Sequence, residues 1–480
     1  MDAAVAECTK AIRSRISAHS RGSNASGDWS YGGSCFVLVS QSYPAADIEL
    51  LPRKIRQQMQ CDAASTPSIA GTVVETVFST TNGASCSGLA MLYHAPNKST
   101  PHQTGESNIE GRLFHVGDMH GRQRLREIAV GRWHNEMTDR FSKHSSATQW
   151  IPGQSSVTRA ASQLQLPPEL ASAAQDASRV KLLVFATDKE SRQVLDALDK
   201  SFPHAAKLGI VGSQTPFLNG REFTIFNQDK ISDSGVVGFA FIDMGKTSAD
   251  DDCEQHRPPK IVYRHLEPIS DVLEIKRCKG NVLLDVENGE AARALISIVR
   301  KHRTDTHKAG VDNRLFARIS KTKEGVAHEC STTDSAIFQV TGGDPAKGGL
   351  AIDTLRDLSP GHYVQFMMTT RNQPEHASVL QAIHQRGARP SANQIALAFG
   401  ASDSAGPGVD GGADDLPANL ANIASIFGGA SEGGFVYGGS SRTETTLSAT
   451  QSSDNSVFSG SSECAVPESV ALLLLDQRIK

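Results

Sequence analysis

The stretch with the clearest capacity for chemistry is 114-FHVGDMHGR-122, which contains the spacing Gly-Asp-x-His-Gly. An aspartate and a histidine at this spacing supply the carboxylate and imidazole ligands with which a two-metal phosphoesterase centre begins. Under this hypothesis Asp118 and His120 would bind metal. Such a centre also needs ligands from later strands, and no Gly-Asn-His-Asp or Gly-Asn-His-Glu element follows. The sequence therefore favours a polar turn between two strands, and we expect no catalytic metal and no cofactor.

Two glycine-containing stretches could bind phosphate, but both have the wrong spacing. In 341-TGGDPAKGG-349, Lys347 precedes glycine and a predicted strand, whereas a phosphate loop places Gly-Lys-Ser/Thr at the start of a helix. In 208-LGIVGSQTPFLNGREFTIF-226, a strand follows the glycines where a dinucleotide-binding turn requires a helix. We therefore expect a protein that is not an enzyme, with the metal-dependent phosphoesterase as an alternative.

The composition is that of an ordinary soluble globular protein. The chain has 480 residues, of which 39% are hydrophobic and 21% charged, and this length has room for two to four domains. The net charge of −4 does not suggest a surface that binds nucleic acid or a membrane. The longest apolar run, 470-VALLLL-475, is too short to span a bilayer. We expect neither a nucleic-acid partner nor a membrane span.

The N-terminus and the cysteines indicate an intracellular protein. Residues 2–21 carry four basic and two acidic side chains, which weakly matches a mitochondrial transit peptide, although a plain helix is favoured. The eight cysteines form no CxxC pair and are expected to be free thiols. We expect a cytoplasmic location, with the mitochondrion or the nucleus as alternatives.

Hydrophobic periodicity reveals a repeated unit of strand, helix, glycine-containing strand and closing strand. The first copy has strands at 36–40, 69–78 and 87–95 and a helix at 44–60, and the second has strands at 182–186, 208–211 and 234–243 and a helix at 189–202. The closing strands 87-SGLAMLY-93 and 234-SGVVGFAF-241 are close counterparts.

A third, fainter copy lies near the C-terminus. Residues 394–400 form a predicted strand, and 468-ESVALLLLD-476 forms a buried closing strand. Between them, Leu420, Ile423 and Phe427 are spaced to share a helix face. The polar stretches 401–415 and 442–464 bury few apolar residues and are expected to be mobile loops.

A different segment separates the second and third copies. Residues 271–302 predict two strands joined at 278-CKGN-281 and then a helix, and residues 337–352 predict a hairpin. A further strand is expected within 359–371 and a helix at 376–386. The sequence therefore predicts an α/β fold of repeated strand-helix-strand modules with mixed sheets, plus an inserted small antiparallel α+β segment in the C-terminal half.

This pattern resembles the FIST domain family, whose N- and C-terminal halves occur in bacterial sensors and in the F-box only protein 22 family. The resemblance is carried by 182-LLVFATD-188, 208-LGIVGSQTPF-217, 234-SGVVGFAF-241, 281-NVLLDVENGEAARAL-295 and the 340–367 segment that contains LSPGHYVQFM. It implies an N-terminal helix or tail at 1–33, a FIST N-terminal half at 34–260 and a C-terminal half at 261–480. The N-terminal half would contain two related modules, at about 34–150 and 165–260.

The resemblance implies a sensory or protein-interaction module that binds a small polar, amino-acid-like ligand and signals through a partner protein. Residues 1–33 are too short and too polar to form an F-box, so direct docking to a ubiquitin-ligase core is not supported. A substrate-recognition scaffold in ubiquitin-dependent turnover, acting with a ubiquitin-ligase partner, is the alternative by analogy.

The candidate ligand-binding residues lie in the three glycine-containing stretches. Ligands of α/β sheets bind beyond the strand ends, where glycine lets the backbone approach closely and hydroxyl or carboxylate groups recognise polar atoms. These residues are Gly71, Thr72, Gly209, Gly212, Ser213, Thr215, Asn219, Gly429, Ser431 and Glu432. The alternative interpretation is that the same residues only form tight turns.

Overall fold

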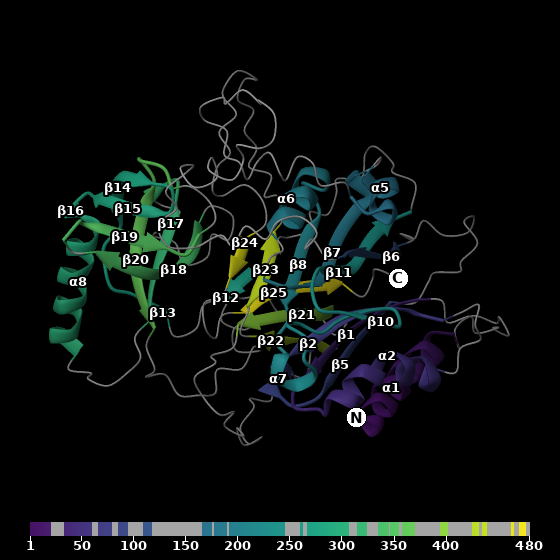
Figure 1. The fold of residues 1–480 in the computed structure, drawn as a ribbon. Coiled ribbons are helices and arrows are strands. Elements are labelled where there is room, and N and C mark those ends of the chain that lie inside the picture. Colours follow the sequence, from purple (N-terminus) through teal and green to yellow (C-terminus); the bar gives the residue numbers. More distant parts are fainter. Residues whose placement is uncertain are drawn as a thin grey trace, which may run out of the picture.

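The computed structural model is mixed α/β and consists mostly of strands in several mixed sheets (Figure 1). It describes residues 1–20, 33–59, 66–78, 85–94, 109–117, 166–174, 177–189, 192–244, 260–262, 266–306, 314–323, 335–344, 346–354, 358–369, 394–401, 425–431, 434–438, 462–464 and 470–476. Three sheets follow the three copies of the repeat, and a fourth group of strands carries α8.

The first copy forms a sheet of mixed direction around β1 (Ser34–Ser40). α2 (Ala45–Met59) connects β1 to β2 (Ser68–Val74), which pairs with β1 in parallel, and β5 (Leu89–His94) pairs antiparallel on the other side. The helix buries the stripe that the sequence predicts, namely Ile48, Leu51, Ile55 and Met59. The predicted order of strand, helix, strand and closing strand is therefore confirmed for this copy.

The second copy repeats this arrangement. α6 (Arg192–Ser201) connects β7 (Val180–Thr187) to its parallel neighbour β8 (Ala206–Val211), and β11 (Val236–Asp243) pairs antiparallel with β7. Three further elements join this sheet or precede it: β6 (Ile109–Val116), which pairs with β11, α5 (Pro168–Ala174) and the short helix η3 (Ala177–Arg179).

The third copy has the same strand order. β21 (Gln394–Ala401) pairs in parallel with β22 (Ser425–Ser431) and antiparallel with β25 (Val470–Asp476), whose outer edge receives β12 (Lys260–Val262). The predicted closing strand is thus confirmed. The prediction for Phe427 was wrong, because this residue lies in β22 and not on a helix. A buried strand residue can match helical spacing by chance when the run is short.

The copies exchange strands in a closed cycle. The second strand of each parallel pair is followed in the chain by a short strand that pairs with a different copy: β3 with β22, β9 with β2, and β23 with β8. These strands and their hairpin partners are β3 (Thr76–Phe78) with β4 (Ser85–Cys86), β9 (Ile225–Asn227) with β10 (Lys230–Ser232), and β23 (Phe435–Gly438) with β24 (Ser462–Cys464). The first copy therefore extends the third sheet, the third extends the second, and the second extends the first.

The exchange follows the same register in all three places. In each parallel pair one glycine lies opposite a residue of the first strand: Gly71 opposite Val37, Gly209 opposite Phe185, and Gly428 opposite Ala398. In each copy the residue after that glycine pairs with the incoming strand: Thr72 with Ile225, Ile210 with Phe435, and Gly429 with Val77. The three copies are therefore related by an approximate threefold arrangement that the sequence similarity alone does not reveal.

Alternation along the strands of the first sheet separates residues that face a shared core from residues that face α2. Phe36 and Leu38 of β1 join a core cluster that also contains Leu208 and Phe399 of the other two sheets. Their neighbours Cys35, Val37 and Val39 face the cluster that includes α2. Phe36, Phe399 and Phe427 contact one another at ring-centroid distances of 6.1–6.4 Å. Apolar burial of this kind holds the three sheets together.

The inserted segment forms a closed barrel of antiparallel pairs where the sequence predicts a small antiparallel sheet. Its strands are β14 (Leu273–Lys279), β15 (Val282–Val286), β17 (Leu315–Ser320), β18 (Ser335–Asp344), β19 (Gly349–Ile352) and β20 (Tyr363–Thr369). Pairing runs β14-β15-β19-β18-β17-β20 and returns to β14. Closure leaves no exposed edge in this cycle, which protects it from pairing with other chains. Two short strands join it, β13 (Leu266–Pro268) on β20 and β16 (Gly289–Glu290) on β15.

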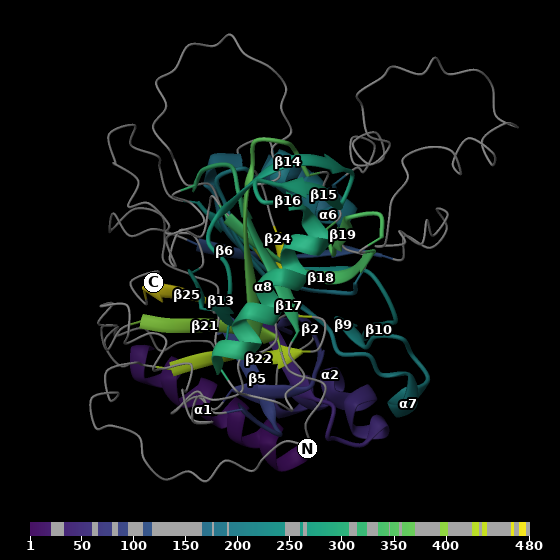
Figure 2. The same cartoon turned by 90° about the vertical axis from the view of Figure 1, so that its left-hand side faces the viewer.

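A single described helix packs on the barrel, and the barrel packs on the shared core. α8 (Ala291–Thr306) buries Ala291 and Leu295 against the apolar barrel cluster. On another side, Phe316, Ile337 and Met367 of the barrel belong to the same cluster as the three sheets. Figure 2 shows α8 running along the outside of the barrel.

Several predictions fall outside the described residues. The helix at 376–386, the positions of Leu420 and Ile423, and most of 401–415 and 442–464 lie there. The predicted loop at 442–464 was wrong at its end, because Ser462–Cys464 form β24 and pair with β23. Its polar, small residues gave no strand signal because the pairing partner comes from another part of the chain.

The N-terminal segment contains a helix, as the sequence predicts. α1 (Asp2–Ser20) lies against α2 and β5 and buries Val5 in the cluster beneath α2. None of the helices that the structure describes is both long enough and apolar enough to cross a membrane.

The close strand contact at Gly71 gives a first prediction. A Cβ at this position would lie 1.9 Å from the carbonyl oxygen of Val37, so Gly71→Ala must push β1 and β2 apart. We expect a loss of at least about 1–3 kcal/mol in the free energy of unfolding, as for other overpacked sites. Gly342→Ala is the control, since a Cβ there meets no heavy atom within 4 Å. Equal urea-denaturation midpoints for the two variants would contradict the packing described here.

The position of β25 gives a second prediction. This strand lies between β12 and β21 and contributes the buried Ala471 and Leu473. A truncation after Cys464 removes it and exposes the edge of β21, so we expect an aggregated or partly unfolded product. A truncation after Asp476 keeps β25 and should remain soluble. Unchanged thermal melting of the shorter protein would show that the third sheet does not depend on its closing strand.

Candidate functional site

The exchanged strands meet at a junction, defined here as residues 72–75, 211–215 and 430–431 together with Thr224. The amide of Ser213 donates a hydrogen bond of 2.9 Å to the carbonyl of Val73. In the equivalent place, the amide of Glu75 donates to the carbonyl of Ala430 at 3.1 Å. The third equivalent donor would be Glu432, which lies outside the described residues. The backbone therefore links the sheets in succession at the ends of their parallel strands.

The predicted ligand-binding hydroxyls come together at this junction. The hydroxyl of Ser213 donates to that of Ser431 at 3.2 Å, and both side chains are buried. Gly212 lies beside them, and a Cβ there would be 2.5 Å from Oγ1 of Thr72. The second and third glycine-containing stretches therefore converge at this junction, and Thr72 of the first stretch joins them.

Thr224 is the polar centre of this junction, although the sequence analysis did not identify it. Its carbonyl accepts from Oγ1 of Thr72 at 3.0 Å, and its hydroxyl lies 2.8 Å from that of Thr215. The side-chain amide of Asn219 also donates to the Thr224 hydroxyl, at 2.9 Å. Thr215 further donates to the carbonyl of Arg221 at 3.1 Å. Four predicted site residues therefore use their polar groups within the chain: Thr72, Ser213, Thr215 and Asn219.

The glycines of the candidate site serve close packing inside strands. Gly71, Gly209 and Gly429 lie within β2, β8 and β22, whereas the ligand-binding hypothesis requires positions beyond the strand ends. A Cβ at Gly209 would lie 2.3 Å from the ring of Phe185, and one at Gly429 would lie 2.7 Å from the carbonyl oxygen of Thr76. Glycine is required here because a neighbouring ring or backbone occupies the space of a side chain.

Ser431 also stands in a Gly-x-Ser-x-Gly pattern, 429-GASEG-433, which the nucleophile of many serine hydrolases shares. That nucleophile occupies a sharp turn between a strand and a helix and is exposed to substrate. Here Ser431 ends β22 and is fully buried, and the next described element is the strand β23. The motif therefore lacks the structural context that a nucleophile elbow needs.

The candidate metal ligands Asp118 and His120 lie outside the described residues, just beyond the end of β6 at Val116. His115 on β6 is half-buried, and burial lowers the pKa of its imidazole. Within the described ranges, no group of three or more His, Cys, Asp or Glu side chains is arranged to hold a metal ion.

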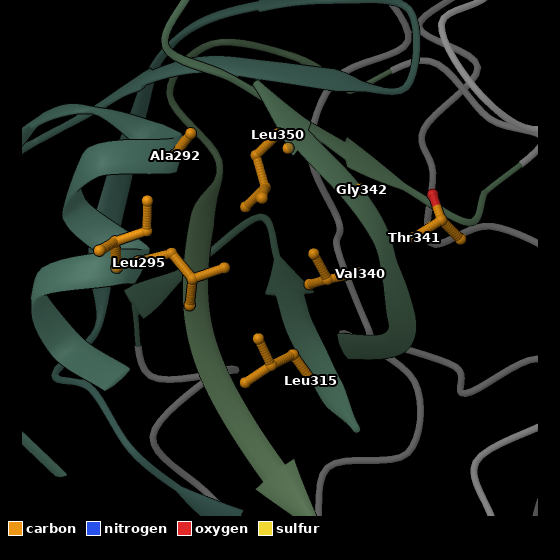
Figure 3. Close-up of a pocket in the computed structure, with 9 residues that line it drawn as sticks. Ala292, Leu295, Leu315, Val340, Thr341, Gly342 and Leu350 are labelled. Atoms are coloured by element: carbon orange, nitrogen blue, oxygen red, sulfur yellow. The ribbon is translucent and has the colours of Figure 1, made fainter. Parts of the chain in front are cut away.

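A pocket in the barrel region was not predicted from the sequence. It has a volume of about 270 Å³ and lies where α8 faces β17, β18 and β19. Its lining consists of Ala292, Leu295, Ile296, Leu315, Val340, Thr341, Gly342, Gly343 and Leu350. Figure 3 shows Leu295 on the helix facing Val340 and Leu315 across the space. Threonine supplies the only polar side chain in this lining, so the pocket favours an apolar group.

The glycine pair 342–343 makes room for this pocket. The pairing of β18 with β19 shifts between Val340 and Gly342, as at a β-bulge. A Cβ at Gly343 would lie 3.2 Å from Leu350 and 3.8 Å from Ala292, so glycine keeps the helix-facing wall open there. The sequence predicts the hairpin at 337–352 but not the position of α8 over these glycines, which only tertiary packing decides.

The contact between Gly212 and Thr72 can be tested by a double-mutant cycle. Gly212 has no positive φ, so the added Cβ of Gly212→Ala acts by steric contact with the Thr72 hydroxyl. We expect Gly212→Ala to lower the free energy of unfolding by about 1–3 kcal/mol. Thr72→Ala should cost about 0.5–1.5 kcal/mol through its lost hydrogen bond.

Thr72→Ala removes the clashing atom. The double variant should therefore lose less free energy of unfolding than the two single variants lose together, by at least about 0.5 kcal/mol, measured by chemical denaturation. Strict additivity would mean that the two residues do not contact each other in the folded protein.

Comparison with known proteins leaves the family open. No protein-family model matches the chain, and no curated protein matches it as a relative. Membership of the FIST family therefore stays a prediction that rests on the sequence resemblance.

Proposed function

We propose that this chain is a non-enzymatic protein-interaction module that binds an apolar side chain of a partner protein in the pocket beside α8. The observation that carries the proposal is the combination of apolar lining and small size in that pocket. Pockets for drug-sized ligands and cofactors span roughly 300–1,000 Å³ and include several placed polar groups. A volume of about 270 Å³ with one threonine hydroxyl suits a single hydrophobic anchor better.

The three-sheet junction supports this assignment by serving as a scaffold. The hydroxyl and amide groups predicted to read a polar ligand are buried and hydrogen-bonded to one another. A polar ligand at the junction would have to replace those bonds, and unmaking a buried hydrogen bond costs about 1–3 kcal/mol. Binding of a small amino-acid-like ligand stays a prediction from the family resemblance, as does a partner in the ubiquitin-ligase machinery.

The energetics of one anchor set the expected strength of binding. Full burial of a Leu, Ile or Phe side chain contributes about 1.5–3 kcal/mol. At about 1.4 kcal/mol per factor of ten, that corresponds to roughly a 10- to 150-fold effect on affinity. The anchor would therefore determine which partner binds, while the surfaces around the pocket supply the remaining affinity.

Gly343→Leu is a suitable variant for blocking the pocket. Gly343 lines the pocket, has no positive φ, and a Cβ there would lie 3.2 Å from Leu350 and 3.8 Å from Ala292 on α8. The added side chain should therefore enter the space between β18 and α8, and thermal melting verifies that the variant is folded. Gln339→Leu is the matched control, because it adds the same side chain to β18 at an exposed position outside the lining.

The test is selection of a displayed random-peptide library on the wild-type protein, followed by affinity measurement on both variants. We expect the selected peptides to share one large apolar residue. Gly343→Leu should weaken their binding at least roughly tenfold, and Gln339→Leu should leave it unchanged. Selected peptides without an apolar consensus, or with equal affinity for the two variants, would remove the pocket as a partner site.

A further inference from the structure

Phe217 is an aromatic side chain that lies uncovered at the surface of the described part of the protein. Within the described residues, three large apolar side chains are exposed: Leu50 at 44%, Met244 at 39% and Phe217 at 103%. The first two are partly covered by their neighbours, whereas the phenyl ring of Phe217 stands entirely in solvent. Aromatic side chains, Phe among them, are enriched in the cores of protein interfaces.

The backbone around Phe217 holds the ring in a fixed place. α7 (Pro216–Asn219) is closed by amide hydrogen bonds from Leu218 and Asn219 to the carbonyl of Thr215, at 3.0 and 3.1 Å. Gly220 ends the turn with φ of 77°, a conformation that glycine adopts without strain. Leu218 packs against the apolar cluster under α2 and anchors the turn to the first sheet. The ring is therefore presented by an ordered segment, which reduces the entropy lost on binding.

The pocket beside α8 is complementary to this ring in size and chemistry. Its lining is apolar, and it is too small for a drug-sized ligand. The polar side chain of Thr341 belongs to an exposed residue, so a ring entering the pocket would meet mainly Leu, Ile, Val and glycine. We propose that Phe217 of one copy of the chain occupies the α8 pocket of a second copy. This inference rests on the pocket being a side-chain site, as proposed above.

The positions of ring and pocket determine the kind of assembly. Figures 1 and 2 show α7 beside the first sheet and α8 on the outside of the barrel, and the full exposure of Phe217 means that one copy does not fill its own pocket. Ring and pocket are different surfaces, so the contact is head-to-tail. Head-to-tail contacts add further copies into an open chain, unless the rotation between successive copies brings the last copy back to the first and gives a closed cyclic oligomer.

Sedimentation velocity over a wide concentration range tests the assembly on the full chain. The wild type should sediment faster as its concentration rises. Phe217→Ser, which removes the ring, and Gly343→Leu, which narrows the pocket, should each stay monomeric. Leu50→Ser is the matched control, because it removes an exposed apolar side chain elsewhere and should associate like the wild type. Thermal melting of each variant verifies that it is folded.

Mixing the two monomeric variants gives the decisive result. The Gly343→Leu copy still carries the Phe217 side chain, and the Phe217→Ser copy still has an open pocket, so an equimolar mixture should form heterodimers and nothing larger. A wild type that stays monomeric throughout the range, or a Phe217→Ser variant that associates like the wild type, would overturn the proposal. A mixture without heterodimers would overturn it as well.

The two measurements distinguish a failure of self-association from a failure of the pocket as a partner site. If the wild type stays monomeric while Gly343→Leu still weakens binding of selected peptides, the pocket is a partner site whose occupant is another protein. If Gly343→Leu affects neither measurement, the pocket itself is wrongly assigned.

Discussion

The cyclic exchange of strands is the constraint on which the rest of this structure depends. Each module supplies the strand that completes its neighbour's sheet: β3 extends the third sheet, β9 the first and β23 the second. A module without its neighbours would have an unpaired sheet edge and an uncovered inner face, both of which are costly in water. The three modules should therefore fold as one cooperative unit.

This constraint also explains why the most suggestive residues of the sequence are in the interior. Where three sheets meet, backbones approach closely and strand ends bring polar groups together away from solvent. Glycine permits the close approach at Gly71 and Gly209, and the hydroxyls of Ser213, Ser431 and Thr215 satisfy one another or the backbone. The same composition could describe a ligand-binding loop, and only the positions of the partners separate the two roles.

The surfaces that we propose to bind a partner lie outside this junction. The barrel is attached to the shared core through Phe316, Ile337 and Met367, so its opposite surface can carry α8 and the apolar pocket. Phe217 belongs to the segment through which the second module reaches the first sheet, at a tip outside the strand pairing. The exchange thus provides both a rigid base for the pocket and an exposed turn for the ring.

The sequence by itself determined the local elements and their repetition. Alternating and helical periodicities correctly predict β1, α2, β7, α6, β8, β11, β21 and β25, because those patterns reflect which side of each element is buried. The sequence did not determine which copy each short strand would join. It also did not indicate that Phe427 lies in a strand or that Thr224 is the polar centre of the junction. The pocket beside α8 depends equally on contacts between residues far apart in the chain, from Ala292 to Leu350. Pairing partners and cavities arise from the relative placement of elements, which local propensity does not encode, so only the tertiary structure could decide them.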